Sequence, residues 1–232
     1  MYEAKHDFLI ALAHVGRVGR IYRRGHGCFP SIAHVPIAGK VKSPTVSDLL
    51  AILYMKELYM PVKSARAQAI FGGGCFWCLE ALFERIPGVL EVENGYAGGS
   101  RDHPSYQEVC TGLTGHAEVV RITFDPSEVS YAELLGWFWK VHDPTTENRQ
   151  GADVGTQYRS IIYYLDETQR REAEESMRTE QARLRDPIVT ELLPAPRFWV
   201  AEDYHQDYYR AHPEAGYCRV VIAPKLIKAG IM

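Results

Sequence analysis

The stretch FGGGCFWCLE, residues 71–80, places two cysteines three positions apart, directly after a run of glycines. The residues before Cys75 favour a short strand and those after it favour a helix, so Cys75 is predicted at a helix N-terminus. Unpaired backbone N–H groups and the helix dipole favour an anion there, which lowers the pKa of a thiol. The sequence therefore predicts a nucleophilic Cys75. Cys78, almost one helical turn further on, is within reach of a disulfide with it after a modest adjustment.

Phe76 and Trp77 lie between these cysteines, and both are predicted to wall an apolar pocket beside the first thiol. A C-x-x-C spacing also occurs in thioredoxin-like redox sites and in half of many zinc sites. A zinc site needs a second closely spaced pair, whereas Cys28, Cys110 and Cys218 are single and scattered. We therefore expect no metal here, and we expect Cys110 to be buried without a role.

A second stretch that could contribute a catalytic group is GHAEVVRITFD, residues 115–125. Its alternation of apolar and polar residues predicts a strand. In a strand, Glu118 shares a face with Val120, Ile122 and Phe124. A carboxyl group in such an apolar row either reaches water at the rim of the sheet or is desolvated. Desolvation raises its pKa and keeps it protonated near neutral pH, as a general acid requires. Both positions remain open on this pattern alone.

The segments around these two stretches alternate between strand and helix patterns. Strands are predicted at residues 67–74, 89–99, 116–125, 158–166, 188–194 and 197–201. Helices are predicted at residues 75–88, 105–110, 130–142, 167–185 and 202–213. This order predicts an α/β (α+β) fold in two layers, with helices packed on a mixed β-sheet and long irregular loops.

Composition narrows the class of protein. The 232 residues suffice for one hydrophobic core of good size, and the net charge of -3 argues against a nucleic-acid-binding surface. No apolar run reaches the roughly 18 residues that a membrane span needs. Five cysteines, an odd number, argue against a fully paired disulfide framework and favour a reducing compartment. We therefore expect a cytoplasmic protein, by default a monomer, that binds neither nucleic acid nor membrane.

The first 60 residues differ from the rest in charge. They contain 8 Lys/Arg against 4 Asp/Glu, whereas residues 61–232 contain 18 against 25. We expect residues 1–60 to be an N-terminal extension. It is either a poorly ordered segment, a targeting segment or sequence upstream of the true start.

Several separated motifs resemble those of one known family. GGCFWCLE, GYAGG, SYQEVCTGLTGHAEVV, FWKVHDPTT, NRQGADVGTQYRSIIYY and YHQDYY occur in the order found in A-type peptide methionine sulfoxide reductases. The resemblance runs from about Ala69 to about Ala223. It implies that residues 66–232 form a single catalytic domain. That domain would reduce the S epimer of methionine sulfoxide, free or within oxidised proteins.

The resemblance also implies roles for individual residues. Cys75 matches the family's nucleophile, whose thiolate attacks the sulfoxide sulfur and becomes a sulfenic acid. Phe76 and Trp77 match the aromatic pair that holds the substrate methyl group. Glu118 matches the acid that hydrogen-bonds to or protonates the sulfoxide oxygen.

Three further polar residues match the family's pocket. Tyr106 and Tyr158 match hydroxyls that assist around the sulfoxide oxygen, and Asp153 matches a polar residue beside them. No bound cofactor is implied. The reductant implied is thioredoxin, or dithiothreitol in vitro.

The chain departs from the commonest family pattern at Cys78, where many members carry glycine. Cys218 matches a C-terminal cysteine that resolves the sulfenic acid in many members, although RVVIAPKLIK replaces the glycine-rich tail that often follows it. We favour Cys218 slightly over Cys78, because a disulfide from Cys75 to Cys78 would lie within the first helical turn. A relay through both is a third alternative.

Two other functions are compatible with part of the pattern. A general thiol–disulfide oxidoreductase would use the C-x-x-C pair alone, but it leaves Glu118 and Tyr158 unexplained. A non-catalytic module would bind oxidised methionine or a metal without forming product, and Cys75→Ser would change only its affinity.

Overall fold

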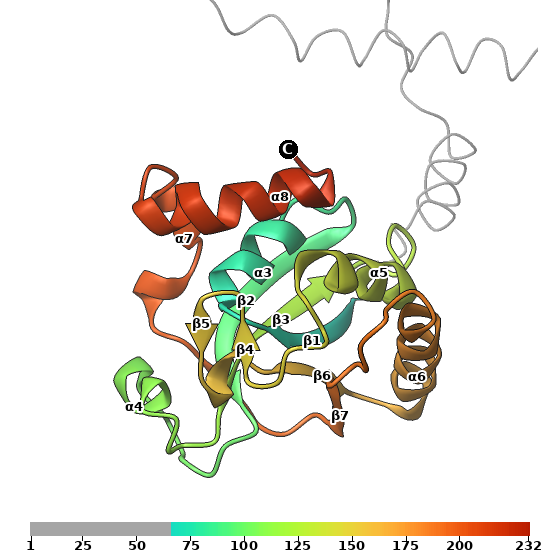
Figure 1. Cartoon of the computed structure of the whole chain (residues 1–232), viewed down its shortest axis with the longest axis horizontal. Coiled ribbons are helices and arrows are strands. Elements are labelled where there is room, and N and C mark those ends of the chain that lie inside the picture. Colours follow the sequence, from blue (N-terminus) through green and yellow to red (C-terminus); the bar gives the residue numbers. More distant parts are fainter. Residues whose placement is uncertain (1–65) are drawn as a thin grey trace, which may run out of the picture. The chain divides into compact units, whose positions relative to one another are not determined.

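A six-stranded sheet forms the centre of the computed structural model, which describes residues 66–232; these residues belong to one compact unit (Figure 1). The predictions made for residues 1–60 lie outside the described residues. The strand order is β7-β6-β1-β3-β2-β8, and all neighbours are antiparallel except β6 and β7, which are parallel. The strands are β1 (Ala67–Gly73), β2 (Val89–Ala97), β3 (Ala117–Phe124), β6 (Ser160–Tyr164), β7 (Glu191–Pro194) and β8 (Phe198–Val200). The predicted mixed sheet is confirmed.

Helices and short turns connect these strands. The α-helices are α3 (Phe76–Phe83), α4 (Tyr106–Cys110), α5 (Tyr131–Val141), α6 (Glu167–Gln181), α7 (Tyr208–Ala211) and α8 (Ala223–Ala229). Between them lie the 3-10 turns Thr156–Tyr158 and Asp203–His205, the π-helical turn Cys218–Ile222, and a two-stranded hairpin of β4 (Arg149–Gln150) and β5 (Asp153–Val154). No helix in this described part of the chain is long and apolar enough to cross a membrane.

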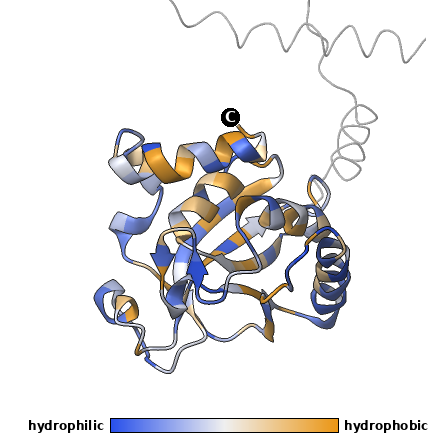
Figure 2. Ribbon diagram, viewed as in Figure 1, coloured by the Kyte–Doolittle hydropathy of each residue, from blue (hydrophilic) through white to orange (hydrophobic). Residues whose placement is uncertain are grey.

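Local signals explain where several helices begin. Ser105 and Glu108 form a capping box at the start of α4, and Ser130 and Glu133 form the predicted one at the start of α5. Asp166 caps α6, whose outer surface is largely hydrophilic (Figure 2). This charged helix buries few of its residues, so its contribution to the core is small.

The main core lies between one face of the sheet and the helices α3, α5 and α8, which contact one another. Strand β3 supplies Val120, Ile122 and Phe124 to this core, while Val119 packs in a smaller cluster on alternate positions. Glu118 lies on the face of the main core, as the alternation predicts. The strand therefore brings a carboxyl group beneath α3.

The C-terminal region differs from the prediction. The single helix predicted at 202–213 is wrong, because the chain breaks at Asp207, which has a φ of +54°. The Glu80 carboxylate of α3 holds this break by accepting hydrogen bonds from the backbone N–H groups of Asp207 at 2.7 Å and Tyr208 at 3.1 Å. Residues 218–229, for which no element was predicted, form continuous helical structure that buries Leu226 in the core.

Candidate active site

Cys75 lies at the junction of β1 and α3, as predicted, in the N-cap position of the helix. Gly74 before it has a φ of +91°, and a Cβ added there would lie 2.6 Å from the Cβ of Gln150. The turn therefore requires glycine at this position. The backbone N–H of Cys78 donates to the carbonyl of Cys75 at 3.0 Å, which closes the first turn beneath the thiol. Cys75 is 7% exposed.

The two thiols of this turn share one environment. The Cys75 side chain is hydrogen-bonded to the Cys78 thiol and contacts the Tyr217 hydroxyl. Burial, followed by the hydrogen bond to Cys78 and then by the charge of Cys78, raises the pKa of Cys75 well above its ordinary value. The hydrogen bond from Cys75 and the ammonium group of Lys225 lower the pKa of Cys78 to about 7. The predicted lowering of the Cys75 pKa is therefore wrong for the substrate-free protein, because desolvation outweighs the helix N-terminus; of the two thiols, Cys78 is the one whose pKa is lowered.

Glu118 of β3 lies beneath the start of α3. It is 1% exposed, and its Oε2 accepts a hydrogen bond from the Phe76 backbone N–H at 3.1 Å. Burial raises the pKa of Glu118 to about 8 despite this hydrogen bond. Of the two positions that the sequence left open, the desolvated one is correct. A carboxyl group that is protonated at neutral pH therefore lies next to Cys75.

Aromatic rings wall the space beside the thiol. Phe76 is fully buried against the ring of His205, at a centroid distance of 5.0 Å. Trp77 stacks on Tyr208 of α7 at 3.6 Å with an interplanar angle of 6°, and Tyr217 meets its edge at 5.9 Å. The predicted aromatic pair therefore belongs to a larger wall, whose other members come from the C-terminal region.

The three polar residues expected from the family pattern lie around Glu118. Its charge raises the pKa of both Tyr106 and Tyr158, after the larger effect of their own burial. Asp153 of β5 raises the pKa of Glu118 in turn, and accepts a hydrogen bond from the Tyr217 hydroxyl at 2.8 Å. The structure thus places these three residues, which come from α4, β5 and the turn Thr156–Tyr158, about one carboxyl group.

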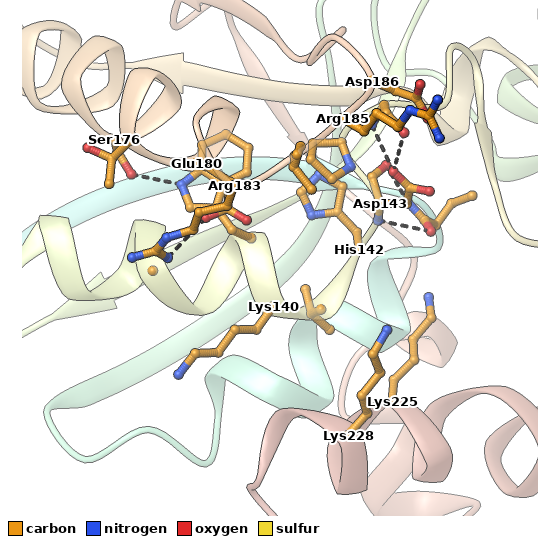
Figure 3. Close-up of a pocket in the computed structure, with 18 residues that line it drawn as sticks. Lys140, His142, Asp143, Ser176, Glu180, Arg183, Arg185, Asp186, Lys225 and Lys228 are labelled. Atoms are coloured by element: carbon orange, nitrogen blue, oxygen red, sulfur yellow. Dashed lines mark hydrogen bonds and ion pairs between the residues drawn. The ribbon is translucent and has the colours of Figure 1, made fainter.

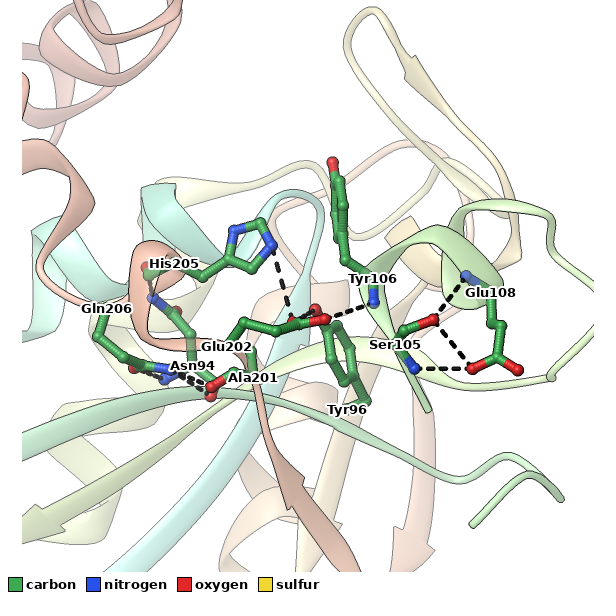
Figure 4. Close-up of polar contacts among 9 residues, drawn as sticks. All are labelled: Asn94, Tyr96, Ser105, Tyr106, Glu108, Ala201, Glu202, His205 and Gln206. Atoms are coloured by element: carbon green, nitrogen blue, oxygen red, sulfur yellow. Dashed lines mark hydrogen bonds and ion pairs between the residues drawn. The ribbon is translucent and has the colours of Figure 1, made fainter. Parts of the chain in front are cut away.

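A polar network that the sequence patterns do not predict lies behind the aromatic wall (Figure 4). Glu202 accepts hydrogen bonds from the Tyr106 backbone N–H at 2.8 Å and from the Tyr96 hydroxyl at 2.9 Å. His205 lies 4.0 Å from Glu202, and within residues 66–232 neither of its ring nitrogens finds a hydrogen-bond partner. Burial lowers the pKa of His205, so the ring is neutral. In the sequence, the stretch YHQDYY, which contains His205, is the signal that could have pointed to this network.

The other cysteines occupy different settings. Cys218 is fully buried in the π-helical turn, where burial and then the charge of Cys78 raise its pKa. Cys110 is exposed at the end of α4, so the prediction that it is buried is wrong. Its thiol contacts the Tyr106 side chain and raises the pKa of Tyr158, which places it near the pocket. The described cysteines are all free thiols.

A separate cavity of about 840 Å³ lies among α5, α6 and α8 (Figure 3). Its lining includes neither Cys75 nor the aromatic pair. Lys225 and Lys228 project side by side from α8 in this view, and Lys225 also reaches Cys78. Among residues 66–232, no group of three or more His, Cys, Asp or Glu side chains could hold a metal ion.

Comparison with known proteins gives one family. The model of the family "Peptide methionine sulfoxide reductase" matches residues 67–230. A peptide methionine sulfoxide reductase MsrA of Acinetobacter baumannii (strain AYE) is 58% identical over 164 residues, which cover 69% of this chain and 92% of the relative. The corresponding MsrA of Sulfolobus acidocaldarius is 56% identical over 160 residues, with 69% and 91% covered.

Solved structures agree with this match. Reduced Mxr1 of Saccharomyces cerevisiae superposes with a TM-score of 0.64 at 32% identity, over 67% of this chain and 91% of that one. Methionine sulfoxide reductase A of Corynebacterium diphtheriae gives 0.63 at 37% identity, over 66% and 78%. The matched region contains the thiol pair, the buried acid and the aromatic wall described above. The chain belongs to the peptide methionine sulfoxide reductase family.

Proposed function

We propose that this chain reduces the S epimer of methionine sulfoxide to methionine, both free and within oxidised proteins. The observation that carries the proposal is the pairing of Cys75 with Glu118. A thiol nucleophile and a carboxylic acid that stays protonated at neutral pH meet at one aromatic wall. A sulfoxide oxygen leaves poorly unless it is protonated as it departs, so the two groups supply what the reaction needs.

The protonation of Cys75, Cys78 and Glu118 defines how the reductive step proceeds. The Cys75 thiol passes its proton to the Cys78 thiolate, to which it is hydrogen-bonded. The Cys75 sulfur then attacks the sulfoxide sulfur while Glu118 gives its proton to the oxygen. The S–O bond of the substrate breaks, the OH group is transferred to Cys75, and methionine leaves. Cys75 is oxidised to a sulfenic acid and the substrate sulfur is reduced.

The remaining residues bind and orient the substrate. Phe76 and Trp77 hold the methyl group against their rings, while the hydroxyls of Tyr106 and Tyr158 donate hydrogen bonds to the sulfoxide oxygen. The raised pKa values of both tyrosines keep their hydroxyls protonated. Apolar rings on one side and donors on the other distinguish methyl from oxygen, which supports selection of one epimer.

Cys78 is the first resolving cysteine in this proposal, and Cys218 is the second. Cys78 contacts Cys75 directly, whereas Cys218 is linked by charge to Cys78. The order Cys75, Cys78, Cys218 carries oxidation away from the pocket, and thioredoxin, or dithiothreitol in vitro, reduces the final disulfide. We further propose that residues 66–232 act as one catalytic domain, with Asp153 orienting Tyr217. The enzyme would work in the cytoplasm, since the free thiols of the described residues suit a reducing compartment, and a monomer is the default for its assembly.

The test uses the two separated epimers of methionine sulfoxide with dithiothreitol as reductant. The wild-type chain should consume the S epimer and leave the R epimer, and Cys75→Ser should consume neither. Cys28→Ser is the matched control, because it removes a thiol to which no role is assigned, and it should retain activity. Turnover by Cys75→Ser, or consumption of the R epimer alone, would overturn the proposal.

A further inference from the structure

Lys225 contacts Cys78 of the thiol pair, yet it has no role in the steps above. We propose that Lys225 is a positioning residue for the second half of the reaction, in which its ammonium group holds Cys78 as the thiolate that attacks the Cys75 sulfenic acid. This inference rests on the proposed function and deepens it.

The geometry of α8 supports this role. Lys225 Nζ donates to Cys78 Sγ at 3.5 Å, across 147 residues of sequence. Leu226, its neighbour on α8, is fully buried in the main core, which fixes the helix and therefore the start of the lysine side chain. Cys78 is 1% exposed, so a thiolate there has almost no water to stabilise it. A half-buried ammonium group at hydrogen-bonding distance supplies that stabilisation.

Five groups act on or around Cys78. Cys75 precedes it on the same turn, Glu118 lies below on β3, Tyr217 and Cys218 face it from the C-terminal region, and Lys225 faces it from α8. In the reduced protein, the largest lowering of the Cys78 pKa comes from the Cys75 hydrogen bond, and Lys225 follows.

Oxidation changes this balance. Once Cys75 is a sulfenic acid, its S–H donor no longer exists. The Tyr217 hydroxyl has a single proton and donates it to Asp153, so Lys225 is the charged donor to Cys78. Lys225 therefore gains importance at the step in which Cys78 must be a nucleophile.

The step itself balances without another reactant. Cys78, which took up the Cys75 proton in the reductive step, first releases that proton to solvent. The Cys78 thiolate then attacks the Cys75 sulfur, the S–S bond forms, and the S–OH bond of the sulfenic acid breaks. Hydroxide leaves and takes a proton from solvent to become water. Cys78 is oxidised and the Cys75 sulfur is reduced from the sulfenic to the disulfide level.

The preceding reductive step should be nearly insensitive to Lys225. That step uses the form in which Cys75 is ionised and Cys78 carries the proton, and this form lacks the hydrogen bond from Lys225 to a thiolate. Removing Lys225 therefore takes little stabilisation from the attacking form itself, and methionine release should slow much less than disulfide formation. A variant of Lys225 should thus slow mainly disulfide formation, whereas a variant that has lost its structure would slow both steps.

The experiment compares Lys225→Met, which keeps the length of the side chain, with Lys225→Arg, which keeps the charge. Lys228→Met is the matched control, because it removes a neighbouring cation from α8 and from the same cavity. Two measurements are made on the full chain. Titration of ¹³Cβ-labelled cysteine by NMR, in a Cys75→Ser background, reads the ionisation of Cys78 directly. Rapid-quench single turnovers with methionine-S-sulfoxide record methionine release, trapped sulfenic acid and disulfide as functions of pH.

Lys225→Met should move the Cys78 titration up by at least about one pH unit, the scale of an opposite charge at this distance. Disulfide formation at pH 6.5 should then slow about three- to tenfold, after allowing for the greater nucleophilicity of a more basic thiolate. Sulfenic acid should accumulate, and the rate should approach that of wild type at high pH. Lys225→Arg and Lys228→Met should behave like wild type.

Unchanged Cys78 titration and unchanged disulfide formation in Lys225→Met would overturn this inference alone, provided that methionine is released. If the folded, reduced wild-type chain releases no methionine, the proposed function fails instead. Equal slowing by Lys225→Met and Lys228→Met would also overturn the inference, because it would indicate a general effect of α8.

Discussion

Replacing Glu118 by glutamine separates the chemistry of this carboxyl group from its packing. Burial raises the pKa of Glu118 from 4.5 to about 8. Between these values the folded protein holds a proton that the unfolded chain has lost, so the contribution of Glu118 to stability falls as the pH rises. At about 1.4 kcal/mol per pH unit, the cost reaches about 3 kcal/mol at neutral pH and about 5 kcal/mol at high pH.

Glutamine removes this dependence while keeping an oxygen that can accept the hydrogen bond from Phe76. Its buried NH₂ group has a cost of its own, about 1–3 kcal/mol, but that cost does not vary with pH. The comparison is therefore between slopes. Urea unfolding of both chains from pH 5 to pH 8 should show the wild type losing about 3–4 kcal/mol relative to Glu118→Gln.

Although Glu118→Gln should gain stability relative to the wild type as the pH rises, it should lose activity. Glu118→Gln cannot protonate the sulfoxide oxygen, so methionine release in a single turnover should slow by about 10²–10⁴-fold. The wild-type rate should fall above about pH 8, as Glu118 loses its proton, and the variant should lack this decline. Parallel stability curves for the two chains, or normal methionine release by the variant, would refute the assignment of Glu118 as a buried acid.

Three further substitutions test the surroundings of the thiol. Phe76→Ala should lower the free energy of unfolding by about 3–5 kcal/mol in urea, because the ring is fully buried; a loss below about 1 kcal/mol would contradict this packing. Trp77→Ala removes the ring that stacks on Tyr208 and should raise KM for the S epimer about two- to tenfold; an unchanged KM would exclude Trp77 from the substrate wall. Glu80→Gln places an NH₂ group against backbone N–H groups whose hydrogen bonds Glu80 accepts, so it should lower the free energy of unfolding by about 1–3 kcal/mol. It should also lower kcat/KM, because it loosens Tyr208, on which Trp77 stacks. Wild-type stability of that variant would show that Glu80 does not hold the break before α7.

Features set by local sequence could be predicted. The glycine run and the following apolar helix place Cys75 at the end of β1, and alternation alone places Glu118 on the same face as Val120 and Ile122. The capping box at Ser130 is likewise local. In each case, residues a few positions apart determine the outcome.

Features set by distant residues could not be predicted. A helix N-terminus alone predicts a lowered pKa for Cys75, but the burial of the site and the charge on Cys78 reverse the direction. That charge in turn depends on Lys225, which is remote in sequence. The break at Asp207 depends on Glu80 in the same way, since a helical pattern carries no information about a carboxylate on another element. The roles of Tyr106, Tyr158 and Asp153 came from the family resemblance rather than from their own positions.

The central claim is that Cys75 reduces the sulfoxide and passes its oxidation first to Cys78. A single turnover tests it most directly. Fully reduced protein is mixed with excess L-methionine-S-sulfoxide without reductant, rapidly quenched over a time course, and its thiols are mapped by mass spectrometry. We predict one methionine per protein in the first phase, with a disulfide from Cys75 to Cys78 preceding any that contains Cys218. A first disulfide from Cys75 to Cys218 would contradict the order of resolution, and no methionine from folded, reduced protein would contradict the reaction itself.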